Sequence, residues 1–242
     1  MIYIFDGTID GFLTAFVEAY EDENALLTSK QAQLPLGCQP VFIHTDAARA
    51  KRAKNRLLAF DRNCIFDLDK LLRCGMPDNE QVAFEYFRVL AKQKRSVCNQ
   101  FSIPAVFSAV QYIKKVGLEI HRFHGFIRFM ETESGALYAP FSPDNDICDL
   151  LAPHFRKRLP QFPFVIHDVK RKKAAVYDGV NCFVAPLEEA DVLLSAKEAD
   201  WLHLWKEYYN AVNIPQRARP KQMRGYMPAR YWKFLPETQN RE

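Results

Sequence analysis

The spacing of apolar residues changes near the middle of this 242-residue chain. Before about residue 118, apolar side chains recur mostly at helical spacing, as at Val106, Val110 and Ile113 in the stretch 103–122. After it, short apolar runs are separated by turn residues, which is typical of paired strands. The change predicts two lobes, residues 1–118 and 119–242, which can also pack as one compact domain.

The first lobe is expected to be a mainly helical α/β structure. Thr8 and Thr45 stand where helix N-caps are expected. Two strands are predicted at 1–5 and 39–44, and helices at 9–20, 46–60, 66–73, 79–94 and 103–122.

The second lobe is expected to be an antiparallel sheet with helices packed on one face, which makes the fold class α+β. Asp144 or Asp146 is the expected N-cap of a helix that ends near Arg158. The predicted strands are 124–130, 137–141, 162–169, 174–177 and 181–185, with a later helix at 199–213. Residues 215–236 are expected to form an irregular extension.

The chain has the composition of a protein that stays in the cytoplasm. Its first six residues carry no basic group before Asp6, so they do not resemble a signal peptide. No stretch approaches the roughly 18 apolar residues of a membrane-spanning helix. Its cysteines, none in a Cys-x-x-Cys pair, are expected to be buried free thiols: Cys38, Cys64, Cys74, Cys98, Cys148 and Cys182.

Charge is distributed unevenly along the chain, although the formal net charge is only +4. Residues 1–29 contain six acidic residues and no Lys or Arg, whereas 215–236 contain six basic residues and no acid. This polarity favours a basic face for a polyanion and an acidic face for another partner.

Nucleic-acid binding is the best supported activity, because cations and aromatic rings are concentrated in two segments. Four cations are expected at the tip of the hairpin formed by 162–169 and 174–177. The candidate nucleic-acid-binding residues are Arg156, Lys157, Arg158, Lys170, Arg171, Lys172, Lys173, Arg217, Arg219, Lys221, Arg224, Tyr226, Tyr231 and Trp232.

A second candidate site is a polar centre made of His154, Arg158, Arg128 and Asp168. His154 and Arg158 are four residues apart and share a helix face. Arg128 lies in a strand-like apolar run, so its guanidinium is expected to pair with Asp168 or to bind an anion. These four residues are the candidates for catalysis.

No metal or cofactor is expected. The pair formed by His121 and His124 lacks further ligands, and the predicted strand onset at 124 interrupts the helix that would align them. No Gly-rich phosphate loop, Gly-x-Ser-x-Gly elbow or nucleophilic cysteine motif is present. Whether the protein is an enzyme stays open at this point.

Several motifs together carry a family resemblance. They are YIFDGT at 3–8, GFLTA at 11–15, HRFHGFIRF at 121–129, APHFRKR at 152–158, FVIHDVKR at 164–171 and MPARYWK at 227–233. The chain resembles the bacterial family of probable DNA-metabolism proteins found beside a radical-SAM protein of putative DNA modification or repair. In some relatives this domain is fused to a uracil-DNA-glycosylase-like domain, for which this chain has no room.

The resemblance implies a process and a partner, DNA repair or modification with a radical-SAM enzyme, and no catalytic residue. We therefore expect a DNA-binding accessory protein whose acidic N-terminal region faces that enzyme. Two alternatives stay open. One is an enzyme acting on DNA or a modified nucleotide through the polar centre, and the other is a protein-interaction scaffold without DNA contact.

Overall fold

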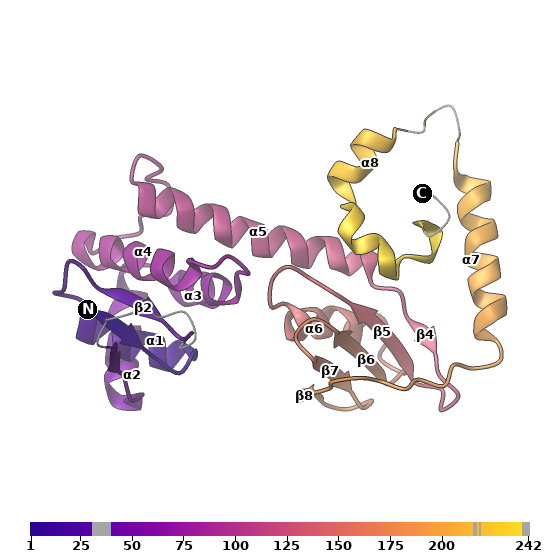
Figure 1. The fold of residues 1–242 in the computed structure, drawn as a ribbon, viewed down its shortest axis with the longest axis horizontal. Coiled ribbons are helices and arrows are strands. Elements are labelled where there is room, and N and C mark those ends of the chain that lie inside the picture. Colours follow the sequence, from indigo (N-terminus) through magenta and orange to yellow (C-terminus); the bar gives the residue numbers. More distant parts are fainter. Residues whose placement is uncertain (31–39, 215–216, 218, 239–242) are drawn as a thin grey trace. The chain divides into compact units, whose positions relative to one another are not determined.

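The computed structural model describes residues 1–30, 40–214, 217 and 219–238 (Figure 1). These residues fold into two compact units, Met1–Gly117 and Leu118–Glu242. The predicted α+β class is confirmed, because each unit combines a sheet with helices. None of the helices in the described part of the chain has both the length and the apolar character needed to cross a bilayer.

The first unit contains a parallel three-stranded sheet. Strand β1 (Ile2–Ile4) lies between β2 (Leu26–Thr28) and β3 (Pro40–Phe42) and pairs in parallel with both. Strand β2 was not expected from the sequence, because three residues are too few for a strand pattern to stand out. The helices are α1 (Ile9–Ala19), α2 (Ala47–Phe60), α3 (Cys64–Arg73) and α4 (Asn79–Gln93), each close to its predicted position.

Aromatic side chains fill the core of this unit. Phe12 and Phe16 are four residues apart, so both project from the same face of α1. Phe12 meets Phe87 edge-on, with ring centroids 5.9 Å apart, and Phe16 meets Phe84 in the same way at 5.9 Å. Burying each such ring stabilises the fold by about 1.5–3 kcal/mol.

The two helices that follow β1 and β3 begin with side-chain caps. Thr8 caps α1 as predicted, since its hydroxyl accepts a hydrogen bond from the amide of Gly11 at 2.9 Å. Asp46, not Thr45, caps α2 and accepts from two first-turn amides at 2.9 Å. The hydroxyl of Thr45 donates instead to Asp6 at 2.7 Å, which ties the ends of β1 and β3 together.

Asp6 also explains why residue 11 is glycine. A Cβ at Gly11 would lie 2.0 Å from an oxygen of the Asp6 carboxylate. Burial opposes ionisation of this carboxyl, but hydrogen bonds from Thr8 and Thr45 win and lower the pKa of Asp6 below its ordinary value.

Helix α5 (Pro104–Phe126) is longer than predicted. It continues through His121 and His124, so the expected strand at 124–130 is wrong except for β4 (Met130–Glu131). Packing of Phe123 explains the extra turn. Its ring lies 5.1 Å from Phe141 and 4.8 Å from Tyr231, contacts that the apolar stripe of a helix can make.

The second unit contains a five-stranded sheet in the order β4-β5-β6-β7-β8. Besides β4, its strands are β5 (Leu137–Phe141), β6 (Phe164–Asp168), β7 (Lys173–Tyr177) and β8 (Cys182–Pro186), all close to their predicted positions. The sheet is mixed, because β5 and β6 pair in parallel. Helix α6 (Cys148–Arg158) makes the crossover that this parallel pair requires, whereas the other three pairings in the sheet are antiparallel, as expected.

The C-terminal part of the second unit is more regular than expected. Helix α7 (Glu198–Val212) is followed by α8 (Pro220–Tyr226) and two 3-10 segments, η3 (Ala229–Phe234) and η4 (Pro236–Thr238). A proline at the first position of α8 costs no hydrogen bond, because that amide has no partner inside a helix. Residues 215, 216 and 218 of the predicted extension lie outside the described residues.

Glu119 of α5 joins this C-terminal part to the rest of the second unit. Its buried carboxylate accepts hydrogen bonds from the backbone amides of Asp144 and Asn145, both at 2.8 Å. It also accepts one from the hydroxyl of Tyr231 at 2.5 Å. Burial and this carboxylate both raise the pKa of Tyr231, so the phenol stays protonated and keeps donating.

Candidate functional site

His154 lies against another histidine. Its ring stacks on His124 with centroids 4.0 Å apart and planes 12° apart, and Phe155 packs edge-on beside it. The Nε2 atoms of both histidines are buried and have no hydrogen-bond partner among the described residues. Burial, with the neighbouring His154 and His121, lowers the pKa of His124. The lowered pKa favours the neutral form of His124 in this stacked contact, and Arg158 is exposed one turn after His154.

Arg128 has a definite partner, but it is not Asp168. Its Nη2 donates to Glu237 at 2.6 Å, and its guanidinium lies 5.1 Å from the ring centroid of Trp205. The Glu237 side chain is only 3% exposed and also accepts from the indole of Trp205 at 3.1 Å. The partner is an internal acid, as predicted, but it is Glu237 and not Asp168. The true partner is 109 positions away along the chain.

Asp168 stabilises the hairpin between β6 and β7. Its carboxylate is fully buried and accepts from the backbone amides of Lys170 and Arg171, each at 3.1 Å. It also forms an ion pair with the guanidinium of Arg171 at 3.0 Å. The same guanidinium donates to the carbonyls of Pro143 and Asp144. Asp168 therefore stabilises the turn between β6 and β7 through these contacts.

The structure consequently gives His154, Arg128 and Asp168 three separate sets of partners. Neither Asp144 nor Asp146 caps α6, which begins after Ile147 without a side-chain cap. Within the described residues, no group of three or more His, Cys, Asp or Glu side chains is placed to hold a metal ion.

The buried cysteines Cys64 and Cys148 are poor nucleophiles. Burial raises the pKa of Cys64 to about 11 and that of Cys148 to about 12, so both thiols stay protonated. Cys74 is buried as expected, whereas Cys98 is half-buried and Cys182 is exposed. Cys38 lies outside the described residues.

The cations at the hairpin tip are mostly paired within the second unit. Arg171 pairs with Asp168, Lys172 pairs with Glu188 at 3.1 Å, and Lys173 pairs with Asp146. Lys170 is exposed and forms no ion pair with a described carboxylate. The tip thus offers less free charge to a phosphate backbone than its sequence indicates.

The remaining cations predicted for binding are exposed. Arg156, Lys157 and Arg158 end α6, and Arg156 lies over the ring of Tyr177 at 5.8 Å. Beyond α7, the four cations that were predicted to bind nucleic acid are all exposed: Arg217, Arg219, Lys221 and Arg224.

Of the three aromatic rings predicted near these cations, one is free. Tyr226 is 71% exposed, whereas Tyr231 is buried at Glu119 and Trp232 is partly buried. The indole of Trp232 donates to the carbonyl of Met227 at 3.0 Å. Tyr226 is therefore the ring that remains available for stacking.

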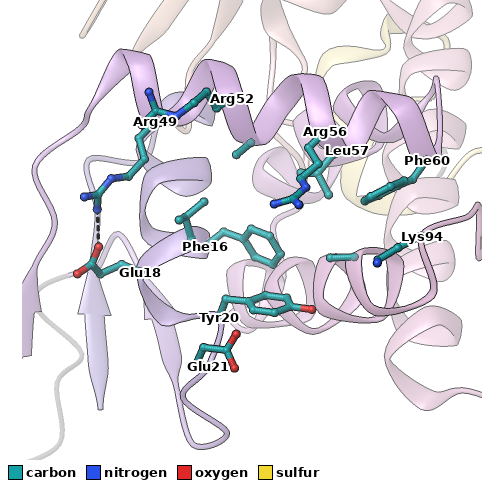
Figure 2. Close-up of a pocket in the computed structure, with 13 residues that line it drawn as sticks. Phe16, Glu18, Tyr20, Glu21, Arg49, Arg52, Arg56, Leu57, Phe60 and Lys94 are labelled. Atoms are coloured by element: carbon teal, nitrogen blue, oxygen red, sulfur yellow. Dashed lines mark hydrogen bonds and ion pairs between the residues drawn. The ribbon is translucent and has the colours of Figure 1, made fainter.

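A groove in the first unit was not expected from the sequence. It has a volume of about 800 Å³ and lies between α1, α2 and the end of α4 (Figure 2); we call it the α1–α2 groove. Its apolar lining is Phe16, Val17, Tyr20, Ala53, Leu57, Phe60 and Ala91, and its charged lining is Glu18, Glu21, Arg49, Arg52, Arg56 and Lys94.

Three of the four cations that line this groove have no acidic partner among the described residues. Arg49 is held by Glu18 at 2.5 Å, whereas Arg52, Arg56 and Lys94 form no ion pair with a described carboxylate. The signal in the sequence is the spacing of Arg49, Arg52 and Arg56, which places the three guanidinium groups on one face of α2.

Comparison of the chain with curated proteins gives no match, and comparison with solved structures gives none either. A family model does match, over residues 77–237, which is more than half of the chain and includes the hairpin tip and the C-terminal cations. Its description is a domain of unknown function, DUF4130. The chain therefore belongs to the DUF4130 family.

Proposed function

We propose that this protein binds nucleic acid through its C-terminal basic segment, defined by Arg217, Arg219, Lys221, Arg224 and Tyr226. The observation that carries the proposal is that these side chains are exposed, while three of the four hairpin-tip cations are paired internally. Exposed cations release counterions when they meet phosphates, and an exposed ring can receive an unpaired base.

DNA is the nucleic acid that we propose, because the chain resembles DNA-metabolism proteins. The same resemblance supports a radical-SAM enzyme as partner and DNA repair or modification as the process. In this proposal the protein is an accessory that holds DNA for the enzyme. The hypothesis of an enzymatic polar centre gains no support from the separate surroundings of His154, Arg128 and Asp168.

Helix α7 supports a protein partner. None of its residues is buried, and it exposes large apolar side chains at Trp201, Leu204, Tyr208 and Val212. Their spacing places all four on one face of the helix. An exposed apolar face of this kind marks protein contacts more often than it serves the free protein. Co-purification with the radical-SAM protein should fail for Trp201→Ala combined with Tyr208→Ala.

The test of DNA binding removes three cations at once. Arg219, Lys221 and Arg224 are changed to alanine, and a labelled oligonucleotide is titrated by fluorescence anisotropy at several salt concentrations. The slope of log affinity against log salt should fall by about three. The control changes Lys51, Arg62 and Arg95, which are exposed cations of the first unit. Equal slopes for parent, variant and control would refute this interface.

A further inference from the structure

We propose that the α1–α2 groove binds a nucleotide, meaning a planar aromatic base that carries a phosphate. This site lies in the first unit and is separate from the C-terminal basic segment, so it goes beyond the proposed function. The ligand can come from two sources, a free mononucleotide or an unpaired nucleotide within a strand. Their shared chemistry is what the groove recognises.

The aromatic floor suits a planar ring. Phe16 is buried at its base and meets Tyr20 edge-on, with centroids 5.6 Å apart. Tyr20 and Phe60 are only partly buried, so part of each ring remains open to the groove. A base stacked on such a ring contributes about 1–3 kcal/mol.

The cations suit a phosphate. Arg52 and Arg56 are four residues apart on α2 and both line the groove, so this side of the helix supplies two positive charges to it. Figure 2 shows Arg56 and Lys94 extending from their helices toward Tyr20. One guanidinium group can donate two parallel hydrogen bonds to two oxygens of a phosphate.

The acidic residues leave the groove with an excess of positive charge. Glu18 is neutralised by Arg49, which leaves Glu21 against Arg52, Arg56 and Lys94. A carboxylate at the edge of a base site has a use, because it can accept a hydrogen bond from an exocyclic amino group.

The size and lining also favour a nucleotide over an acidic peptide. A cleft of about 800 Å³ has the size of a small-molecule site, and its apolar and aromatic side chains lie beside a nearly equal number of charged ones, which suits a ligand that has both a ring and an anionic group. An acidic peptide would use the cations but would leave the rings Tyr20 and Phe60 without a planar partner. We therefore treat peptide binding as an outcome of the test.

The experiment uses the full chain and isothermal titration with adenosine 5′-monophosphate (AMP). Adenosine and inorganic phosphate, titrated separately, should each bind more weakly than AMP, because each lacks half of the recognised chemistry. Arg52→Ala with Arg56→Ala should weaken AMP binding by about tenfold or more. The matched control, Lys51→Ala with Arg62→Ala, removes the same charge outside the groove and should leave AMP binding unchanged.

Two further variants test the floor. Tyr20→Leu and, separately, Phe60→Leu keep an apolar side chain but remove a ring, and each should weaken AMP binding several-fold. Thermal unfolding identifies a variant that fails to fold, in which case the other variant decides. The proposal would be overturned if Tyr20→Leu and Phe60→Leu both bound AMP as tightly as the parent. It would also be overturned if a glutamate-rich peptide bound the parent as tightly as AMP.

A second experiment distinguishes the two sources of the nucleotide. It uses the variant in which Arg219, Lys221 and Arg224 are changed to alanine. A short single-stranded oligonucleotide that binds this variant, and is displaced by AMP, identifies a strand as the ligand. AMP binding without oligonucleotide binding identifies a free nucleotide. Failure of the C-terminal segment to bind DNA would leave AMP binding unaffected, so the two proposals can fail separately.

Discussion

The two units of this protein are stabilised in different ways. In the first, the core is a cluster of aromatic and aliphatic residues around Phe12 and Phe87. In the second, buried carboxylates add to the apolar packing. Glu119 and Glu237 each bind a side chain that is distant in the chain, and Asp168 stabilises a tight turn. Glu80 is the nearest equivalent in the first unit, where it accepts from the amide of Ser29 at 2.8 Å.

This difference teaches where charge is available for binding. In the second unit, the hairpin-tip cations Arg171, Lys172 and Lys173 pair with acidic residues, so this basic run contributes less surface charge than its sequence indicates. In the first unit, Arg52, Arg56 and Lys94 line the α1–α2 groove and form no ion pair with a described carboxylate. Stability of the second unit should therefore depend on pH more than that of the first.

The largest effect is expected for Phe12→Ala. Phe12 is fully buried, so truncation leaves a cavity and should lower the free energy of unfolding by about 3–5 kcal/mol. Phe66→Ala is the control, because Phe66 is 72% exposed and its loss should cost less than about 0.5 kcal/mol. Urea denaturation at pH 7 and pH 5 should give the same difference for Phe12→Ala at both values. A strong pH dependence would break the comparison between the units.

A smaller, pH-dependent effect is expected for Glu237→Gln. Burial opposes ionisation of Glu237, but the hydrogen bond and charge of Arg128 prevail and lower the pKa of this carboxyl. The unfolded chain therefore takes up a proton first. The pair stabilises the fold fully above the unfolded value of about 4.3 and is lost as pH falls through the lower folded value.

At pH 7, Glu237→Gln should cost about 1.5–3 kcal/mol, because a charge-assisted hydrogen bond is weakened. The cost relative to the parent should shrink as the pH falls below about 4.3. Glu207→Gln changes an exposed carboxylate of α7 and serves as the control. Chemical denaturation across this range measures both. A cost that persists unchanged in acid would show that the ion pair does not stabilise the unit.

The smallest effect is expected for Lys170→Ala at the hairpin tip. Lys170 can lose at most one phosphate contact, so the salt slope of DNA binding should fall by no more than about 0.9. Substitution of its neighbour Arg171 should reduce stability instead, because it leaves the buried Asp168 unpaired. If anisotropy titrations showed that Lys170→Ala lowers the salt slope as much as the C-terminal triple variant does, the hairpin tip would be part of the DNA interface.

Much of the fold could be predicted because its signals are local. Helix α4 begins at Asn79 as predicted and ends at Gln93, one residue before the predicted end, and Thr8 caps α1 because its hydroxyl reaches an amide three residues on. Strand β2 and the last turn of α5 were missed, since both depend on neighbours that lie far away in the sequence. Phe123, for example, is held in a helical turn by Phe141 and Tyr231.

The candidate sites depended even more on distant contacts. From the sequence alone, Arg128 was predicted to pair with an acid or to bind an anion, because a guanidinium among apolar neighbours must be paired. Only the tertiary structure decided that the acid is Glu237 and that Asp168 pairs with Arg171. Likewise, helical spacing determined that Arg52 and Arg56 share a face, but the packing of α1 and α4 beside α2 decided that this face borders an aromatic groove. Periodicity along one element can be read from the chain, whereas the choice among several chemically suitable partners is made when the elements pack.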